Sequence, residues 1–103
     1  MSISTYTLSG GSAVFTSVGN TAITWLSVTN PDSTADAVDI HVVPALGTPD
    51  NTNLVVSNLS ITADDTYQLY VGAEKLLLSD GDSVHVIATS SSISSVVISY
   101  TTI

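Results

Sequence analysis

Short stretches rich in Val, Ile, Thr and Tyr alternate along this chain with clusters of Gly, Asn, Asp and Ser, which recur at roughly ten-residue intervals. Within several stretches the apolar residues fall at every second position, as Val84, Val86 and Ala88 do, so they share one face of a strand. No stretch repeats apolar residues at intervals of three and four over a dozen positions, so no helix is predicted. The pattern predicts an all-β fold: an antiparallel β-sandwich, jelly-roll or Ig-like, with about eight short strands.

Turn residues bound the predicted strands. Pro31 fixes its own φ and holds Asn30 extended, which predicts a turn at 30–33, and 44–53 is expected to be the one long loop. Strands are expected at Ser2–Leu8, Ala13–Val18, Ala22–Asn30, Ala37–Val43, Leu54–Leu59, Thr66–Val71 and Ile93–Ile103, with two more inside 74–88.

The segment 74–88 predicts a β-hairpin. It holds two apolar runs joined at Asp80-Gly81, a pair that tolerates the positive φ of a tight hairpin turn. The only lysine of the chain, Lys75, lies at its entrance.

Several predicted strands are apolar on both faces, although a sandwich needs an apolar inner face only. One interpretation is that a second copy or a partner covers the surplus apolar residues. The alternative is a β-bulge, which reverses the facing of every residue beyond it. The residues expected opposite the core face, and therefore in a subunit or partner interface, are Trp25, Val43, Val55, Leu76, Ile87 and Val97.

Composition and charge limit the classes of partner that this domain could bind. The 103 residues predict one domain over 1–103; 44% are hydrophobic and only 10% charged, with a mean hydropathy of +0.43. The net charge of −8 argues against nucleic acid and against anionic membrane surfaces, because both require Lys and Arg. No apolar run is long enough for a membrane helix, and the N-terminus lacks the features of a signal peptide. The absence of Cys removes disulfides and thiolate chemistry.

Two groups of residues could bind a metal ion, but neither fits well. Asp80 and Asp82, with Asp64-Asp65 if the fold brings them close, could hold Ca²⁺, although turn chemistry explains them as well and the EF-hand pattern is missing. His41 and His85 are each expected to point away from the core, without a second ligand at a recognisable spacing. We therefore predict no metal and no cofactor. If copies pack around an axis, either His could make assembly depend on pH.

Catalysis finds no support in the sequence. No Ser lies in a G-x-S-x-G motif, and no acid–base carboxylate pair is apparent, so no catalytic residue is predicted. A sugar-binding platform of aromatic residues is a further alternative; its candidates would be Trp25, Tyr6, Tyr67, Tyr70 and Tyr100.

Four segments together resemble a group of small virion proteins of tailed bacteriophages, common in marine and cyanobacterial phages. The segments are 21–30 (TAITWLSVTN), 37–44 (AVDIHVVP), 74–86 (EKLLLSDGDSVHV) and 96–100 (VVISY). They are similar to the group's A-I-x-S-I-x-V-x-N, V-D-V-x-V, E-K-L-x-L-x-x-G-D-x-L-x-V and V-x-V-S-Y-x-E-I patterns. The resemblance runs from Thr21 to Ile103. The chain departs from it at Trp25, where the group has small residues, and at 101–103, which replace an acidic ending.

The resemblance implies an antiparallel sandwich that forms a multimer around an axis and attaches to a virion. It implies a capsid decoration (cement) protein, made in the host cytoplasm, that binds the major capsid protein or another virion protein as a homotrimer and stabilises the assembled shell. Alternatives are a tail, baseplate or neck component, and a host-surface or glycan-binding adhesion module. No enzymatic activity is implied, and Trp25 is the first candidate for a contact particular to this chain.

Overall fold

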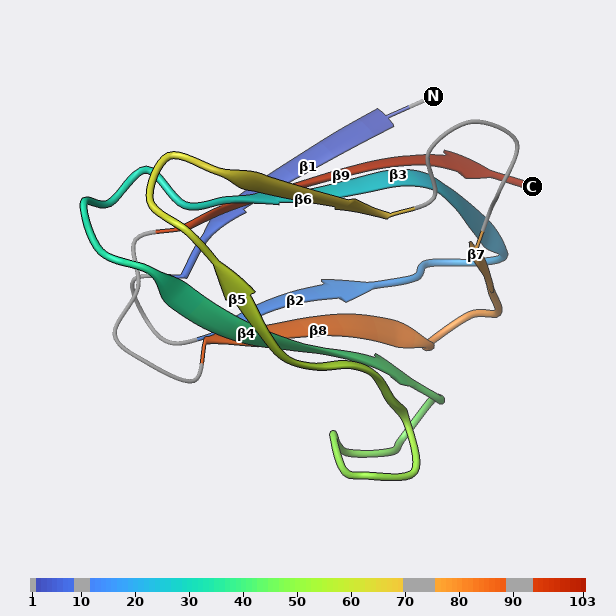
Figure 1. Cartoon of the computed structure of the whole chain (residues 1–103). Helices are drawn as coiled ribbons and strands as arrows, with labels where there is room; N and C mark the ends of the chain where they lie inside the picture. The colour runs from blue at the N-terminus through green and yellow to red at the C-terminus, as the bar shows by residue number, and fades with distance from the viewer. Residues whose placement is uncertain (1, 9–11, 70–75, 89–93) are drawn as a thin grey trace.

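A computed structural model describes residues 2–8, 12–69, 76–88 and 94–103 of the chain. In these residues the chain forms nine strands and no helix. The strands make two antiparallel sheets that pack face to face (Figure 1). The predicted all-β antiparallel sandwich is therefore confirmed.

The two sheets divide the strands almost equally. The first sheet, called sheet A, has the order β1-β9-β3-β6, and the short β7 pairs with β3 beside β6. The second, sheet B, has the order β2-β8-β4-β5. The strands are β1 (Ser2–Thr7), β2 (Ser12–Thr16), β3 (Thr21–Thr29), β4 (Asp36–Val43), β5 (Leu54–Ile61), β6 (Thr66–Leu69), β7 (Leu76–Leu78), β8 (Ser83–Ala88) and β9 (Ser95–Thr102).

The pairing follows a nested order. The first strand pairs with the last, β2 with β8, β3 with β6 and β4 with β5. A chain whose strands pair in this nested order, within two four-stranded sheets, is a jelly roll. The strand β7 is an addition to that fold. Of the two sandwich types expected, the chain therefore adopts the jelly roll.

The core lies between the inner faces of the two sheets. Alternate residues of the central strands point into it, such as Leu26 of β3 and Ile98 of β9, which are 0% and 1% exposed. From sheet B, Ile40 and Val86 lie directly opposite each other and are equally buried. The rings of Phe15 and Tyr100 meet across the sandwich with their centroids 4.8 Å apart.

The predicted hairpin over 74–88 is wrong in its pairing. The Asp80-Gly81 turn is present: Gly81 has a φ of +87°, and the N–H of Asp82 donates to Ser79 O at 3.1 Å. However, the strand before the turn, β7, joins sheet A, whereas β8 after it joins sheet B. The turn therefore passes the chain from one sheet to the other (Figure 1). An Asp-Gly pair supplies the positive φ for either kind of turn, so the local pattern could not distinguish them.

A β-bulge in β3 explains one error in predicted facing. Regular alternation would put Ile23 and Trp25, two positions apart, on the same face, but the register with β9 shifts between them. Ile23 consequently turns into the core at 0% exposure, while Trp25 stays on the outer face opposite Ser99. The extra residue is Thr24, whose hydroxyl donates to Ser99 O.

Candidate interaction surfaces

The structure places four of the six predicted contact residues away from the core and at least partly exposed. Trp25 and Val97 are half-buried on the outer face of sheet A, and Ile87 is half-buried on the outer face of sheet B. Val55 on the edge strand β5 is 49% exposed. These four do not form one patch, because they lie on two sheets that face in opposite directions.

Val43 lies on the outer face as predicted, but the chain itself covers it. Its register opposite Ser83 puts it on the same face as His41, away from the core. It is nevertheless 0% exposed, because the 44–53 loop folds back over this end of sheet B, and the Val43 side chain packs close to Gly47. The surplus apolar residue is therefore buried within the chain and is not available to a partner.

Leu76 was assigned to the wrong face. It lies opposite Ile23 and packs against the core, as does Leu78, which is 3% exposed. Leu77 between them points outward and is 66% exposed. A run of three leucines has no polar residue to set the phase, so the sequence could not decide which leucine faces out.

In the part of the chain that the structure describes, the strands of sheet A place no charge on its outer face. The strands β1, β3, β6, β7 and β9 contain no Asp, Glu, Lys, Arg or His. Strand register places Ile3, Ser99 and Trp25 in one row across this face, and Thr5, Val97 and Ser27 in the next. Ile3 is 69% exposed. Interface cores are depleted of charged residues and enriched in aromatic ones, so this face, with Trp25 among its uncharged residues, is suitable for contact with another protein surface.

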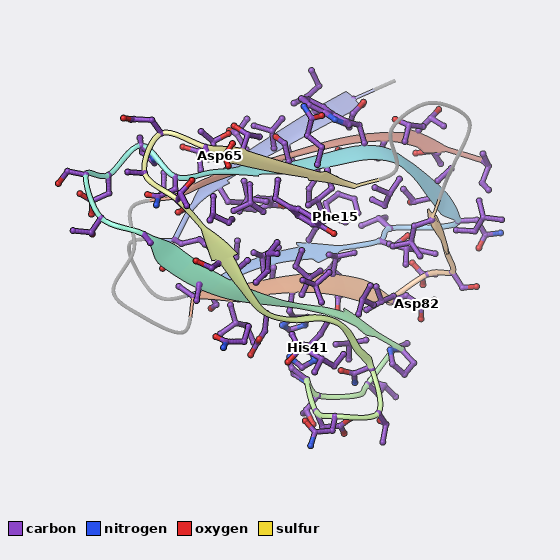
Figure 2. All side chains as sticks on the ribbon, in the orientation of Figure 1. Phe15, His41, Asp65 and Asp82 are labelled. Carbon is purple, nitrogen blue, oxygen red and sulfur yellow. The ribbon has the colours of Figure 1, made fainter. Side chains whose placement is uncertain are left out.

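His41 and His85 lie side by side on the outer face of sheet B. They are directly opposite each other on β4 and β8, and Figure 2 shows His41 below the sheet, beside the 44–53 loop. His41 Nδ1 is 2.8 Å from Asn53 Oδ1. That oxygen also accepts from Asp50 N, so it acts as the acceptor and His41 Nδ1 carries the proton. His85 Nε2 lies 3.0 Å from Ser83 Oγ. The two histidines are therefore neighbours within one chain, and His41 fastens the 44–53 loop to β4 through Asn53.

The pKa of His85 predicts that stability depends on pH. Burial lowers this pKa below its usual 6.5, and the charge of His41 lowers it further. The unfolded chain therefore takes up the proton at a higher pH than the folded chain, and stability is lost as the pH falls from about 6.5 through the folded-state pKa. We expect a lower thermal midpoint at about pH 5.5 than at about pH 7.5, and we expect His85→Gln to reduce this difference.

Asp50→Asn is the control for this experiment. Hydrogen bonds from Thr52 lower the pKa of the exposed Asp50 carboxyl below 3.8, so it stays ionised over the whole range tested. The control should lower stability at both pH values and alter the pH dependence less than His85→Gln does, since the His41 charge is the smallest of the causes that act on Asp50. Calorimetry of the three proteins decides the matter: if His85→Gln kept the full pH dependence, another group would be responsible.

Asp80 and Asp82 have structural partners. Asp82 Oδ1 accepts from Ala45 N and Oδ2 from Ser79 N, each at 2.9 Å. Asp80 Oδ1 accepts from Gly19 N at 2.8 Å. The two carboxylates thus tie the turn between the sheets to the loops after β2 and β4, and turn chemistry accounts for both.

Asp64-Asp65 do not join those carboxylates. They form the turn between β5 and β6, where Asp64 N donates to Asn30 O and Asp65 O accepts from Asn30 N. Figure 2 shows Asp65 and Asp82 at opposite ends of the sandwich. Within the described parts of the chain, no three His, Cys, Asp or Glu residues are grouped closely enough to hold a metal ion.

The tyrosines that the structure describes do not form a sugar platform. Tyr6, Tyr67 and Tyr100 pack against the core, on the inner face of sheet A. Tyr70 lies outside the described residues. Trp25 on the outer face is therefore separated from these three rings by the thickness of its own sheet.

Sequence reasoning missed Asn30 as a structural centre. Its side chain is 1% exposed; Nδ2 donates to Thr34 O at 2.8 Å and Ile61 O at 3.0 Å, while Oδ1 accepts from Asp32 N at 3.0 Å. Asn30 thus holds the turn after β3 against the end of β5. The signal available was the Asn-Pro dipeptide, which predicts a turn but not its burial.

Comparison with known proteins gives no relative for this chain. No family model matches it, and neither the curated proteins nor the solved structures contain a match. In the described residues there is no helix with the length and hydropathy to cross a membrane.

Proposed function

We propose that this protein is a structural protein of a bacteriophage virion: a capsid decoration (cement) protein that binds the assembled shell as a homo-oligomer, with the major capsid protein as its partner. The observation that supports this most is the uncharged outer face of sheet A, with Trp25 and Val97 at its centre, on a jelly-roll sandwich. Jelly rolls are frequent among viral capsid proteins, which supports the proposal by analogy of fold. The resemblance of four segments to phage virion proteins points in the same direction.

Charge also fits this role. Of the acidic residues that the structure describes, Asp36 and Asp39 lie on β4 of sheet B and the others lie in turns and loops, whereas the strands of sheet A carry none. A decoration protein bound through sheet A would therefore present its negative charge outward, away from the shell. A net charge of −8 would also keep the outer surface of the particle from adsorbing nucleic acid.

Shell binding is expected to depend on Trp25. Truncating a large aromatic residue at the centre of an interface often costs more than tenfold in affinity, so Trp25→Ala should weaken binding to shells by about tenfold or more. The measurement is cosedimentation of the purified protein with shells from the encoding phage lacking this protein. Val14→Ser is the matched control, because Val14 is 42% exposed on the outer face of sheet B and should have no effect.

The same particles separate the alternative functions. Wild-type protein should also raise the temperature at which the shells rupture. Binding to tails, baseplates or necks without binding to shells would overturn the decoration role in favour of another virion position. Selective binding on a glycan array, lost in Trp25→Ala, would favour an adhesion module.

A further inference from the structure

The hydrogen-bond phase of β1 leaves one row of its backbone groups at an open edge. Among the strands that the structure describes, β1 pairs only with β9, at the end of sheet A. The N–H of Leu8 donates to Ser94 O, the residue that continues the β1–β9 register by one step. Directly bonded pairs alternate along an antiparallel ladder, so Ser4 and Tyr6 also bond to β9. The N–H and C=O groups of Ile3 and Thr5 consequently point away from β9.

This edge lacks the features that usually prevent strands from associating. Natural edge strands are protected by charged side chains, proline, bulges or short length. Edge strand β5, by contrast, has register shifts and a positive φ at Asn58. β1 has six residues, a continuous register and no charge or proline, and the neighbouring Ile3 side chain is 69% exposed.

We infer that β1 pairs antiparallel with β1 of a second copy, so that two A sheets join edge to edge across a two-fold axis. In this register Ile3 lies opposite Thr5 of the second copy, and the two residues exchange N–H···O=C bonds in both directions. The axis passes between the two Ser4 residues. The interaction adds four backbone hydrogen bonds and extends each sheet A into its mate.

A second copy fits this edge because the surface is complementary to itself. Pairing Ile3 with Thr5 of the second copy joins the Ile3–Ser99–Trp25 row of one copy to the Thr5–Val97–Ser27 row of the other. Neither row contains a charged residue, so no like charges of the two copies are brought face to face at the junction. An isologous contact of this kind closes on itself and forms a dimer, not a fibre.

The residues at the end of β1 favour this register over one in which the second copy is shifted along β1. A register centred on Thr5 would pair Ile3 with Thr7, a residue that already takes part in an interaction within the chain. Thr7 is also followed by Leu8, which is 0% exposed and anchored to Ser94. Antiparallel pairing of β1 with β1 gives a two-fold dimer, whereas the family resemblance implies a trimer.

A proline substitution tests the edge without breaking the β1–β9 ladder. Thr5→Pro removes an N–H that points to the open edge, where proline is tolerated. Sedimentation velocity over a concentration series should give a dimer for the wild type. The dissociation constant of the Thr5→Pro dimer should be about tenfold higher or more, since each copy loses one hydrogen bond. Thr5→Val keeps the N–H and should dimerise like the wild type. Circular dichroism and thermal midpoints check that each variant is folded.

A single cysteine tests the register. The chain has no native Cys, so Ser4→Cys introduces one thiol per copy. Residues directly opposite in a non-bonded antiparallel pair have Cα atoms about 4.5 Å apart, within the range that a disulfide spans. Ser4→Cys should form a disulfide-linked dimer under mild oxidation. Ser2→Cys, which would lie opposite Tyr6 of the second copy, should not.

Several outcomes would overturn the inference. A wild-type monomer at every concentration, a trimer, or a Thr5→Pro variant that dimerises normally would each exclude edge pairing, and equal cross-linking of both cysteine variants would exclude this register. The inference does not rest on the virion role. Failure to dimerise would leave shell binding through Trp25 intact, and failure to bind shells would leave the dimer intact.

Discussion

Replacing Asn30 with alanine is expected to lower the free energy of unfolding by about 3–5 kcal/mol. The side chain is 1% exposed and makes three hydrogen bonds to backbone groups. Its removal leaves the carbonyls of Thr34 and Ile61 without this donor in a buried site, which costs more than the loss of an exposed bond. For a domain of this size we expect the thermal midpoint to fall by about 15 °C or more.

Asn30→Asp separates the hydrogen bonds from packing. The aspartate has the same shape and can still accept from Asp32 N, but when ionised it cannot donate to either carbonyl. It should destabilise at least as strongly as alanine at neutral pH, and the difference from wild type should shrink near pH 4, where a protonated carboxyl regains one donor. Urea unfolding of the three proteins at both pH values is the measurement. A loss below about 1 kcal/mol for Asn30→Ala would contradict the assigned role.

Strand positions could be predicted from local pattern, because alternation and turn residues are properties of short segments. The predicted strand at 37–43 matches β4 within one residue at its start, and Val38 and Ile40 face the core as expected. The final strand likewise has Val96, Ile98 and Tyr100 on its inner face. Such agreement needs no knowledge of which strands are neighbours.

Pairing and coverage could not be predicted, since both depend on residues distant in the chain. The Asp80-Gly81 turn has the same local chemistry whether its flanking strands pair or separate into two sheets. Trp25 and Ile23 lie two positions apart, and only the bulge at Thr24, visible in the register with β9, puts them on opposite faces. Val43 belongs to the outer face, yet the 44–53 loop buries it. The candidate contact surface is therefore the outer face of sheet A with Trp25 and Val97, and it does not include Val43.

The carboxylate of Asp82 is expected to contribute more to stability than that of Asp80, the other acidic residue of the turn between the sheets. It accepts two backbone N–H groups, from Ala45 and Ser79, at 2.9 Å each, and bonds to a charged acceptor are stronger than neutral ones. Because the site is partly open to solvent, we expect Asp82→Ala to cost about 2–3 kcal/mol, below the full sum for two such bonds.

Two further variants separate the hydrogen bonds from the negative charge. Asp80→Ala removes an equal charge from the same turn but only the bond from Gly19 N, so it should cost about 1 kcal/mol. Asp82→Asn keeps one accepting oxygen and should lie between wild type and Asp82→Ala. Chemical unfolding ranks the four proteins. Equal losses for Asp80→Ala and Asp82→Ala would mean that charge, and not the pair of bonds to Ala45 and Ser79, sets the contribution.

Adding calcium tests whether Asp80 and Asp82 bind Ca²⁺ or serve only as structural turn residues. If Asp80 and Asp82 bound Ca²⁺, the ion would stabilise the folded chain by mass action, and millimolar CaCl₂ would raise the thermal midpoint of wild type but not of Asp82→Ala. We expect no such difference, because three of the carboxylate oxygens already accept backbone N–H groups. Those donors would have to leave, or share their oxygens with the ion, for Ca²⁺ to obtain its usual six to eight ligands. The Asp82 carboxylate therefore holds Ser79, directly after β7 of sheet A, and Ala45, shortly after β4 of sheet B, which is the role that the turn between the sheets requires.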